Sequence, residues 1–314
     1  MLNRIYTIIN SSNPNLYFLR LLITIAIVYF VVTITNRYLP KHTAEGFSQD
    51  EPYVYKENND AVDTFYTSIY DTLHSTETRS QAELIKIIEM TNPSTKNSTL
   101  LDVGSGTGYI VNQLNNAGYN AYGIDNSHEM IESANNLYPD TDYIYGDVMN
   151  SMQFEKGTFT HILCTYFTIY QIKDKKLFFR NCYHWMKPNS YLILHLVDTD
   201  TFTNMIPHVE THKEEVKKNT SRKLQSWATF TDYKYKCTCD IPSDNDNNKT
   251  EIKETFVDIE TNNTRQNGFS LYMEKMNTIL GIASNNGFIK HGKVDMKGCN
   301  GDKNQYLYIL ERPL

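Results

Sequence analysis

Residues Leu100–Leu114 read LLDVGSGTGYIVNQL, and this stretch decides the fold. An apolar run ends at Asp102, glycines follow at positions 104, 106 and 108, and an amphipathic helix pattern comes next. The order predicts a strand, a tight turn and the start of a helix. Glycines in such a turn allow positive φ angles and let the backbone approach a ligand closely. A helix start also offers unpaired N–H groups. The turn is therefore expected to cradle a nucleotide-like cofactor.

Two acidic residues follow this turn at the ends of further predicted strands. Residues Asn120–Ile124 form a short apolar strand pattern that ends at Asp125. Asp125 lies 125 − 104 = 21 positions after Gly104, close to the roughly 20 positions expected for an acid that binds a ribose diol. Ser127 is a suitable N-cap for the helix that follows. A third strand, YIYGD, ends at Asp147.

The rest of the chain continues the alternation of strands and helices up to Asp198, after which consecutive antiparallel strands are predicted. Strands are predicted at 159–165 and 191–197, with a helix at 178–188 and a turn at Asn189–Ser190 between them. After Asp198, residues 232–238, 251–260 and 269–273 alternate like antiparallel strands. A helix at 273–286 and a final antiparallel pair at 289–296 and 305–311 are expected.

The pattern D-x-G-x-G-x-G resembles motif I of the class I S-adenosylmethionine-dependent methyltransferases. Tyr109 stands where a dinucleotide-binding fingerprint would have its third glycine. The resemblance implies an α/β fold with a Rossmann-like seven-stranded sheet, an antiparallel last strand and an extra antiparallel β insertion after strand five. It implies S-adenosyl-L-methionine as cofactor. The residues that it assigns to the cofactor are Tyr66, Arg79, Asp102, Gly104, Ser105, Gly106, Gly108, Asp125, Asn126, Met130, Asp147, Val148 and Cys164.

The segment Ala61–Leu73 is a predicted helix whose FYTSIYD sequence resembles a segment that closes over the cofactor in small-molecule methyltransferases. Aromatic faces there would attract the sulfonium cation, although Phe65, Ile69 and Leu73 also form an ordinary apolar stripe. Arg79 starts the next predicted helix. It either pairs with the cofactor's carboxylate or is an exposed arginine at a helix start.

No catalytic base stands out. The candidates are Tyr166, just after the fourth strand, and His195 in the fifth. Because Leu194 and Leu196 flank His195, a hydrogen-bonded core histidine is the favoured interpretation of that residue. The segment after the fourth strand lacks the (D/N)PP(Y/F) motif of nucleic-acid and glutamine N-methyltransferases. No cluster of acids predicts a metal.

Composition limits the partners and the compartment. The chain has 314 residues, a net charge of −6 and a pI near 5.9, so no basic field favours nucleic acid. Five cysteines show no zinc spacing and no disulfide framework, which suits a reducing compartment.

The N-terminus carries an apolar stretch, Leu16–Thr35, long enough to cross a bilayer. Arg20 lies near its start, where it can snorkel to the headgroups. An uncleaved single-pass anchor is favoured over a signal peptide or a buried helix. The expected organisation is an anchoring segment at 1–36, a polar linker at 37–60 and a methyltransferase domain at 61–314, with the insertion at about 205–272. The domain is expected to face the cytosol.

The sequence thus predicts a membrane-anchored methyltransferase for a small-molecule acceptor, with a protein substrate left open. The alternatives are a nicotinamide-dependent oxidoreductase and a catalytically inactive methyltransferase-like binding protein. Tyr109 and the antiparallel end of the chain disfavour the first, whereas the missing base leaves the second open.

Overall fold

The computed structural model describes residues 49, 51–203, 205–206, 212–218, 221–242 and 248–314, together with Thr24, Val28 and Tyr29. The chain divides into two units, Met1–Gly46 and Phe47–Leu314. Within the described part, no helix is long and apolar enough to cross a membrane. The span expected at Leu16–Thr35 lies outside the described residues, apart from the three named above, which are helical.

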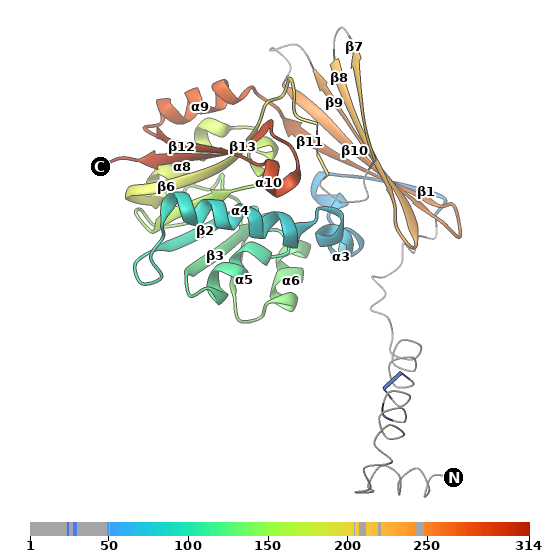
Figure 1. Ribbon diagram of the computed structural model, residues 1–314, viewed down its shortest axis with the longest axis horizontal. Coiled ribbons are helices and arrows are strands. Elements are labelled where there is room, and N and C mark those ends of the chain that lie inside the picture. Colours follow the sequence, from blue (N-terminus) through green and yellow to red (C-terminus); the bar gives the residue numbers. More distant parts are fainter. Residues whose placement is uncertain are drawn as a thin grey trace, which may run out of the picture. The chain divides into compact units, whose positions relative to one another are not determined.

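The larger unit is built on a mixed seven-stranded sheet (Figure 1). The strand order is β12-β13-β6-β5-β2-β3-β4. Strands β2 to β6 pair in parallel, whereas β13 is antiparallel to both of its neighbours. This confirms the predicted sheet with its antiparallel final pair. The strands are β2 (Thr99–Val103), β3 (Asn120–Asp125), β4 (Asp142–Tyr145), β5 (Phe159–Cys164), β6 (Met186–Val197), β12 (Ile289–Asp295) and β13 (Gln305–Arg312).

Helices cover the sheet because its strands are apolar on both faces, as parallel strands usually are. On one face, Leu100, Leu163 and Ile193 pack with apolar residues of α4, α5 and α10. Leu192 and Leu194 belong to the core on the other face, which includes α8 and α9. The helices are α4 (Thr76–Thr91), α5 (Tyr109–Asn116), α6 (His128–Leu137), α7 (Thr168–Gln171), α8 (Lys175–Trp185), α9 (Met276–Asn285) and α10 (Lys297–Asn300).

A second sheet of six strands stands beside the first (Figure 1). Its order is β1-β11-β10-β9-β8-β7, antiparallel except for the parallel pair β1 and β11. Five of its strands lie where the sequence places the insertion. The strands are β1 (Tyr53–Glu57), β7 (His212–Lys218), β8 (Ser221–Thr229), β9 (Tyr233–Pro242), β10 (Lys249–Asp258) and β11 (Thr264–Tyr272).

Strand β1 differs from the sequence analysis, which places residues 37–60 in a linker. Tyr53 to Glu57 pair with Thr264 to Gly268 of β11 instead. The pattern YVYKE alternates, but the strand is short and lies at the sheet's edge, so only its distant partner reveals it. A 3-10 helix, η2 (Asn58–Ala61), and helix α3 (Thr64–Leu73) then lead into the core.

Two further features also differ from the predicted ones. Strand β4 stops at Tyr145, so Asp147 lies in the loop beyond it, where its Oδ1 accepts a hydrogen bond from the Met149 N–H at 2.8 Å. The predicted turn at Asn189–Ser190 falls inside β6, as an irregular stretch in which Asn189 has a φ of 55°.

Candidate active site

The glycine turn after β2 is shaped by contacts that exclude side chains. Gly104 has a φ of 68° and Gly108 a φ of 86°, both in the left-handed region. A Cβ on Gly108 would lie 2.5 Å from the Tyr143 ring, and one on Gly104 would lie 2.7 Å from the Thr168 methyl group. The turn therefore needs glycine for its conformation and for its close neighbours.

The carboxylate of Asp125 ends β3 beside this turn. Its Oδ2 accepts the Gly106 N–H at 2.9 Å, and its Oδ1 accepts the Ser127 N–H at 2.9 Å. Burial raises the pKa of Asp125, against the lowering effect of these N–H donors. Each oxygen can accept a further hydrogen bond. Ser127 caps α6 through the Met130 N–H, as predicted.

Helix α3 is tied to the glycine turn. The Thr107 hydroxyl donates to Asp71 at 2.6 Å, and a Cβ on Gly106 would lie 3.6 Å from the Tyr70 ring. Asp63 caps the helix by accepting the Tyr66 N–H at 3.1 Å. Helix α3, which includes the FYTSIYD segment, therefore lies against the glycine turn.

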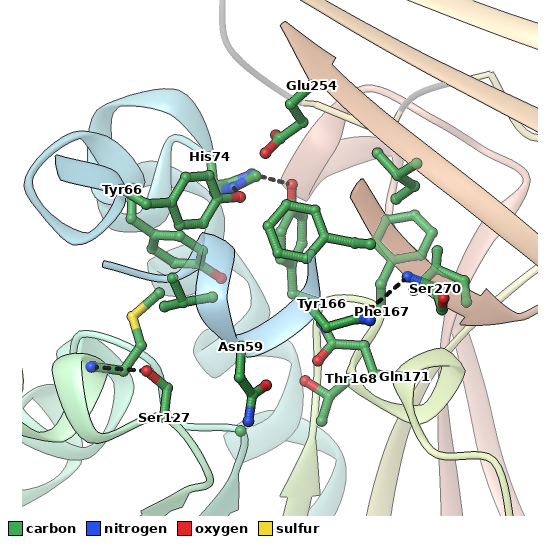
Figure 2. Close-up of a pocket in the computed structure, with 18 of the residues that line it drawn as sticks. Asn59, Tyr66, His74, Ser127, Tyr166, Phe167, Thr168, Gln171, Glu254 and Ser270 are labelled. Carbon is green, nitrogen blue, oxygen red and sulfur yellow. Dashed lines mark hydrogen bonds between the residues drawn. The ribbon is translucent and has the colours of Figure 1, made fainter. Parts of the chain in front are cut away.

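A cavity of about 490 Å³ runs from the glycine turn to the second sheet. Figure 2 shows its lining, with Ser127 at one end and Glu254 at the other. It brings together six of the residues that the sequence singled out: Tyr66, Gly104, Asp125, Asn126, Met130 and Tyr166. A smaller hollow of about 210 Å³ shares Gly104, Asp125 and Asn126, and adds Asp147 and Val148.

These two hollows suit S-adenosylmethionine. Asp125 offers acceptors for a ribose diol, and Met130 offers an apolar surface for a flat ring. The hollow at Asp147 and Val148 adjoins both. The Ser105 hydroxyl is buried without a hydrogen-bond partner among the described residues, which is an orphaned polar atom in the turn itself.

Other predicted cofactor residues line neither hollow: Arg79, Asp102, Ser105, Gly106, Gly108 and Cys164. The Arg79 guanidinium is buried, contacts both carboxylate oxygens of Glu83 at 3.1 Å, and lies 3.8 Å from the centre of the Tyr166 ring. It is thus neither exposed nor facing the cavity. Asp102 is also buried, and burial together with the nearby Glu83 carboxylate raises its pKa.

His195 is a structural residue. Its Nδ1 accepts the Phe167 N–H at 3.0 Å, and its Nε2 lies 3.0 Å from the Gln305 Oε1, so both ring nitrogens are engaged. Burial and the Arg79 charge lower the pKa of His195 to about 3. Phe167 has a φ of 63°, and the bond to His195 holds this strained residue in position. The interpretation of His195 as a core histidine fits this geometry.

Tyr166 takes part in a hydrogen-bonded chain with two residues of the α3 region. Its hydroxyl donates to the Met205 carbonyl at 2.9 Å and lies 2.8 Å from the His74 Nδ1, so Nδ1 carries the proton. The His74 Nε2 can then accept from the Tyr66 hydroxyl at 3.3 Å. Burial and the Arg79 charge lower the pKa of His74 to about 3, so this imidazole is neutral.

His74 and Glu254 were not predicted as site residues from the sequence. His74 follows directly after α3, and nothing in its own neighbourhood marks it. Glu254 carries a usable signal, because it lies between Ile252 and Phe256 on one face of an alternating strand. A charged residue on an otherwise apolar strand face indicates a buried polar site.

Comparisons with known proteins agree with this geometry. A family model described as a methyltransferase domain matches residues 101–194, and no curated protein sequence shows significant similarity to the chain. The structure resembles an S-adenosylmethionine-dependent methyltransferase from Clostridium acetobutylicum ATCC 824, at 15% identity and a TM-score of 0.55, covering 79% of this chain and 98% of that one. It also resembles the CcbJ methyltransferase from Streptomyces caelestis, at 11% identity and a TM-score of 0.56, covering 79% and 96%. A third similar structure is the sugar N-methyltransferase KedS8 from Streptoalloteichus sp ATCC 53650, at 14% identity and a TM-score of 0.53, covering 79% and 93%.

The structural likeness shows the fold, and the family model covers the glycine turn, Asp125, Asp147 and strands up to β6. Residues 101–194 therefore match a methyltransferase domain, and the fold is one that S-adenosylmethionine-dependent methyltransferases share.

Proposed function

We propose that the protein is an S-adenosylmethionine-dependent methyltransferase with S-adenosyl-L-methionine as its cofactor. It transfers the methyl group to a small-molecule acceptor held between the glycine turn and the second sheet. The cavity of about 490 Å³ carries this proposal, because it connects the cofactor end to residues of β10 and β11. Its volume falls in the range typical of small-ligand sites. A nucleic-acid substrate finds no support in the acidic pI of 5.9. A protein substrate would have to insert one of its side chains into this cavity.

The bound cofactor supplies an electrophilic methyl group on a sulfonium. Asp125 and the glycine turn would fix its position, and the rings of Tyr66 and Tyr70 would attract its charge. Tyr66 and Tyr70 lie close together, with ring centres 5.9 Å apart. Alignment of donor and acceptor, with water excluded, is the main requirement for such a displacement.

Cofactor binding by the full chain tests the assignment of the site. Calorimetric titration should show binding of S-adenosylmethionine and S-adenosylhomocysteine and none of NADH. An Asp125→Asn variant keeps one acceptor oxygen but loses the charge, so we expect affinity to fall about 10-fold to 100-fold. A matched control is Asp142→Asn, because Asp142 is exposed at the start of β4, whereas Asp125 ends β3.

Binding of NADH in place of the sulfur cofactors would overturn the proposal in favour of the oxidoreductase. Binding of the sulfur cofactors without turnover across a broad set of acceptors would favour a methyltransferase-like binding protein. An equal loss of affinity in both aspartate variants would remove Asp125 from the site.

We also propose that the segment Leu16–Thr35 anchors the enzyme in a membrane with its domain in the cytosol. This rests on the apolar sequence alone. Protection of the domain from added protease in sealed vesicles would contradict the cytosolic placement.

A further inference from the structure

The carboxylate of Glu254 is an unusual feature of the second sheet. Strand β10 places Glu254 on the face that also carries Phe256, and their exposed fractions are 1% and 0%. Its Oε1 accepts a hydrogen bond from the Tyr235 hydroxyl at 2.8 Å. Its Oε2 is buried and has no hydrogen-bond partner among the described residues. Such an oxygen is costly unless a ligand completes its bonding.

The Glu254 carboxylate points into the cavity toward the group formed by Tyr66, His74 and Tyr166 (Figure 2). Aromatic rings gather at this end, where Tyr66 and Phe269 have ring centres 5.5 Å apart. A carboxylate beside several aromatic faces is the environment that a cation prefers.

Among the described residues, no lysine or arginine forms an ion pair with Glu254. The Arg265 charge lowers the pKa of Glu254. The three nitrogens of Arg265 donate hydrogen bonds elsewhere, to Asn267, to Asp63 and to the Ala61 carbonyl. The imidazole of His74 is neutral, and its ring nitrogens face the hydroxyls of Tyr66 and Tyr166.

We infer that Glu254 binds the acceptor and that the acceptor is an amine, an inference that rests on the proposed function. An ammonium group would pair with Oε2 while its carbon skeleton packs against Ile252, Phe269 and Leu271, which line the same end of the cavity. A carboxylate acceptor would be repelled by Glu254. An alcohol would bring no charge to balance it and needs a stronger base than a carboxylate.

Glu254 acts as the proton acceptor in the transfer. The ammonium nitrogen gives one proton to Oε2 and so gains a free electron pair. That pair attacks the methyl carbon, a new C–N bond forms, and the C–S bond breaks with its electrons left on sulfur. The products are the methylated ammonium and S-adenosylhomocysteine. Glu254 returns its proton to solvent when the product leaves.

Calorimetry on the full chain saturated with S-adenosylhomocysteine tests the inference with three probes of one shape: benzylamine, benzyl alcohol and benzoate. We expect benzylamine to bind at least about tenfold tighter than benzyl alcohol, and benzoate to bind more weakly than either. Glu254→Gln should bring the amine and the alcohol within about threefold of each other, with the affinity for S-adenosylhomocysteine unchanged.

The matched control is Glu251→Gln. Glu251 lies on the same strand at an exposed position beside Lys253, so this variant should keep the full preference for the amine. Equal binding of benzylamine and benzyl alcohol by the unmodified chain would overturn the inference without any variant. So would a preference that persists in Glu254→Gln. Loss of S-adenosylhomocysteine binding by the unmodified chain would instead overturn the proposed function.

Discussion

The ionisation of Glu254 should make the stability of the protein depend on pH. Burial raises the pKa of Glu254 from 4.5 to about 7, against the lowering effects of the Tyr235 hydrogen bond, the nearby Tyr66 hydroxyl and the charge of Arg265. Between these two values the folded protein holds a proton that the unfolded chain has lost. Folding stability contributed by this group is therefore present below pH 4.5 and is lost as pH rises toward 7.

Glu254→Gln removes that titration. We expect the variant to gain stability relative to the unmodified protein between pH 5 and pH 8, by up to about 3 kcal/mol. Urea denaturation at the two pH values measures this difference. If the free energies of unfolding of the unmodified protein and of Glu254→Gln change with pH in parallel, Glu254 is already ionised across the range.

Residues differ in how far the sequence reveals their roles. Gly104, Asp125 and Ser127 are placed by short-range spacing, and the structure holds them at one turn and one helix start. The partner of Arg79 depends on packing, because Glu83 lies one helical turn away but could equally have pointed to solvent. Glu254 lies about 130 residues beyond Asp125 in the sequence, and only the folded second sheet brings both to one cavity.

At the scale of elements, Asp63 joins helix α3 to the second sheet. It caps α3 and forms ion pairs with Arg265 of β11 at 2.8 Å and with Lys56 of β1 at 2.6 Å. Burial acts to raise the pKa of Asp63, but the hydrogen bonds from Arg265 and Lys56 outweigh it and lower the pKa. The stabilising contribution is therefore present above pH 3.8 and is lost as pH falls through the lowered value.

Asp63→Asn keeps a helix cap but leaves the buried Arg265 without its charged partner. We expect the free energy of unfolding to fall by about 2 kcal/mol at pH 7. This difference from the unmodified protein should become smaller as the pH falls below 3.8. Thermal unfolding at both pH values measures it. Asp60→Asn is the control, because Asp60 is exposed in η2. A loss that stays constant with pH would assign the effect to packing and not to charge.

The elements themselves follow from local patterns to different degrees. Helix α3 and strands β2 and β3 are strongly patterned, and their predicted positions agree with the structure within a few residues. Strand β8 was missed because SRKLQSWAT alternates with few apolar residues. Strand β1 was missed because its pairing with β11 spans more than 200 residues, a distance over which no local pattern carries information.

At the scale of the whole molecule, the order of strands in the first sheet could be predicted because the motif I resemblance carries a complete topology. The second sheet could be predicted only as an insertion with alternating strands. Its sixth strand, β1, comes from the segment before α3. A segment before the first sheet and an insertion between β6 and β12 thus build one layer, and the domain starts earlier than residue 61.

Two shortened chains test where the folded domain begins. A chain starting at Phe47 keeps the whole larger unit, so we expect it to unfold at the same temperature as the full chain and to bind S-adenosylhomocysteine equally well. A chain starting at Ala61 loses β1 and the Lys56–Asp63 ion pair, and it exposes the edge of β11. We expect its free energy of unfolding to be lower by about 3 kcal/mol or more, and we expect it to aggregate through that edge. Calorimetric melting and light scattering compare the chains. Equal melting temperatures for both shortened chains would show that β1 is dispensable and would restore the boundary expected at residue 61.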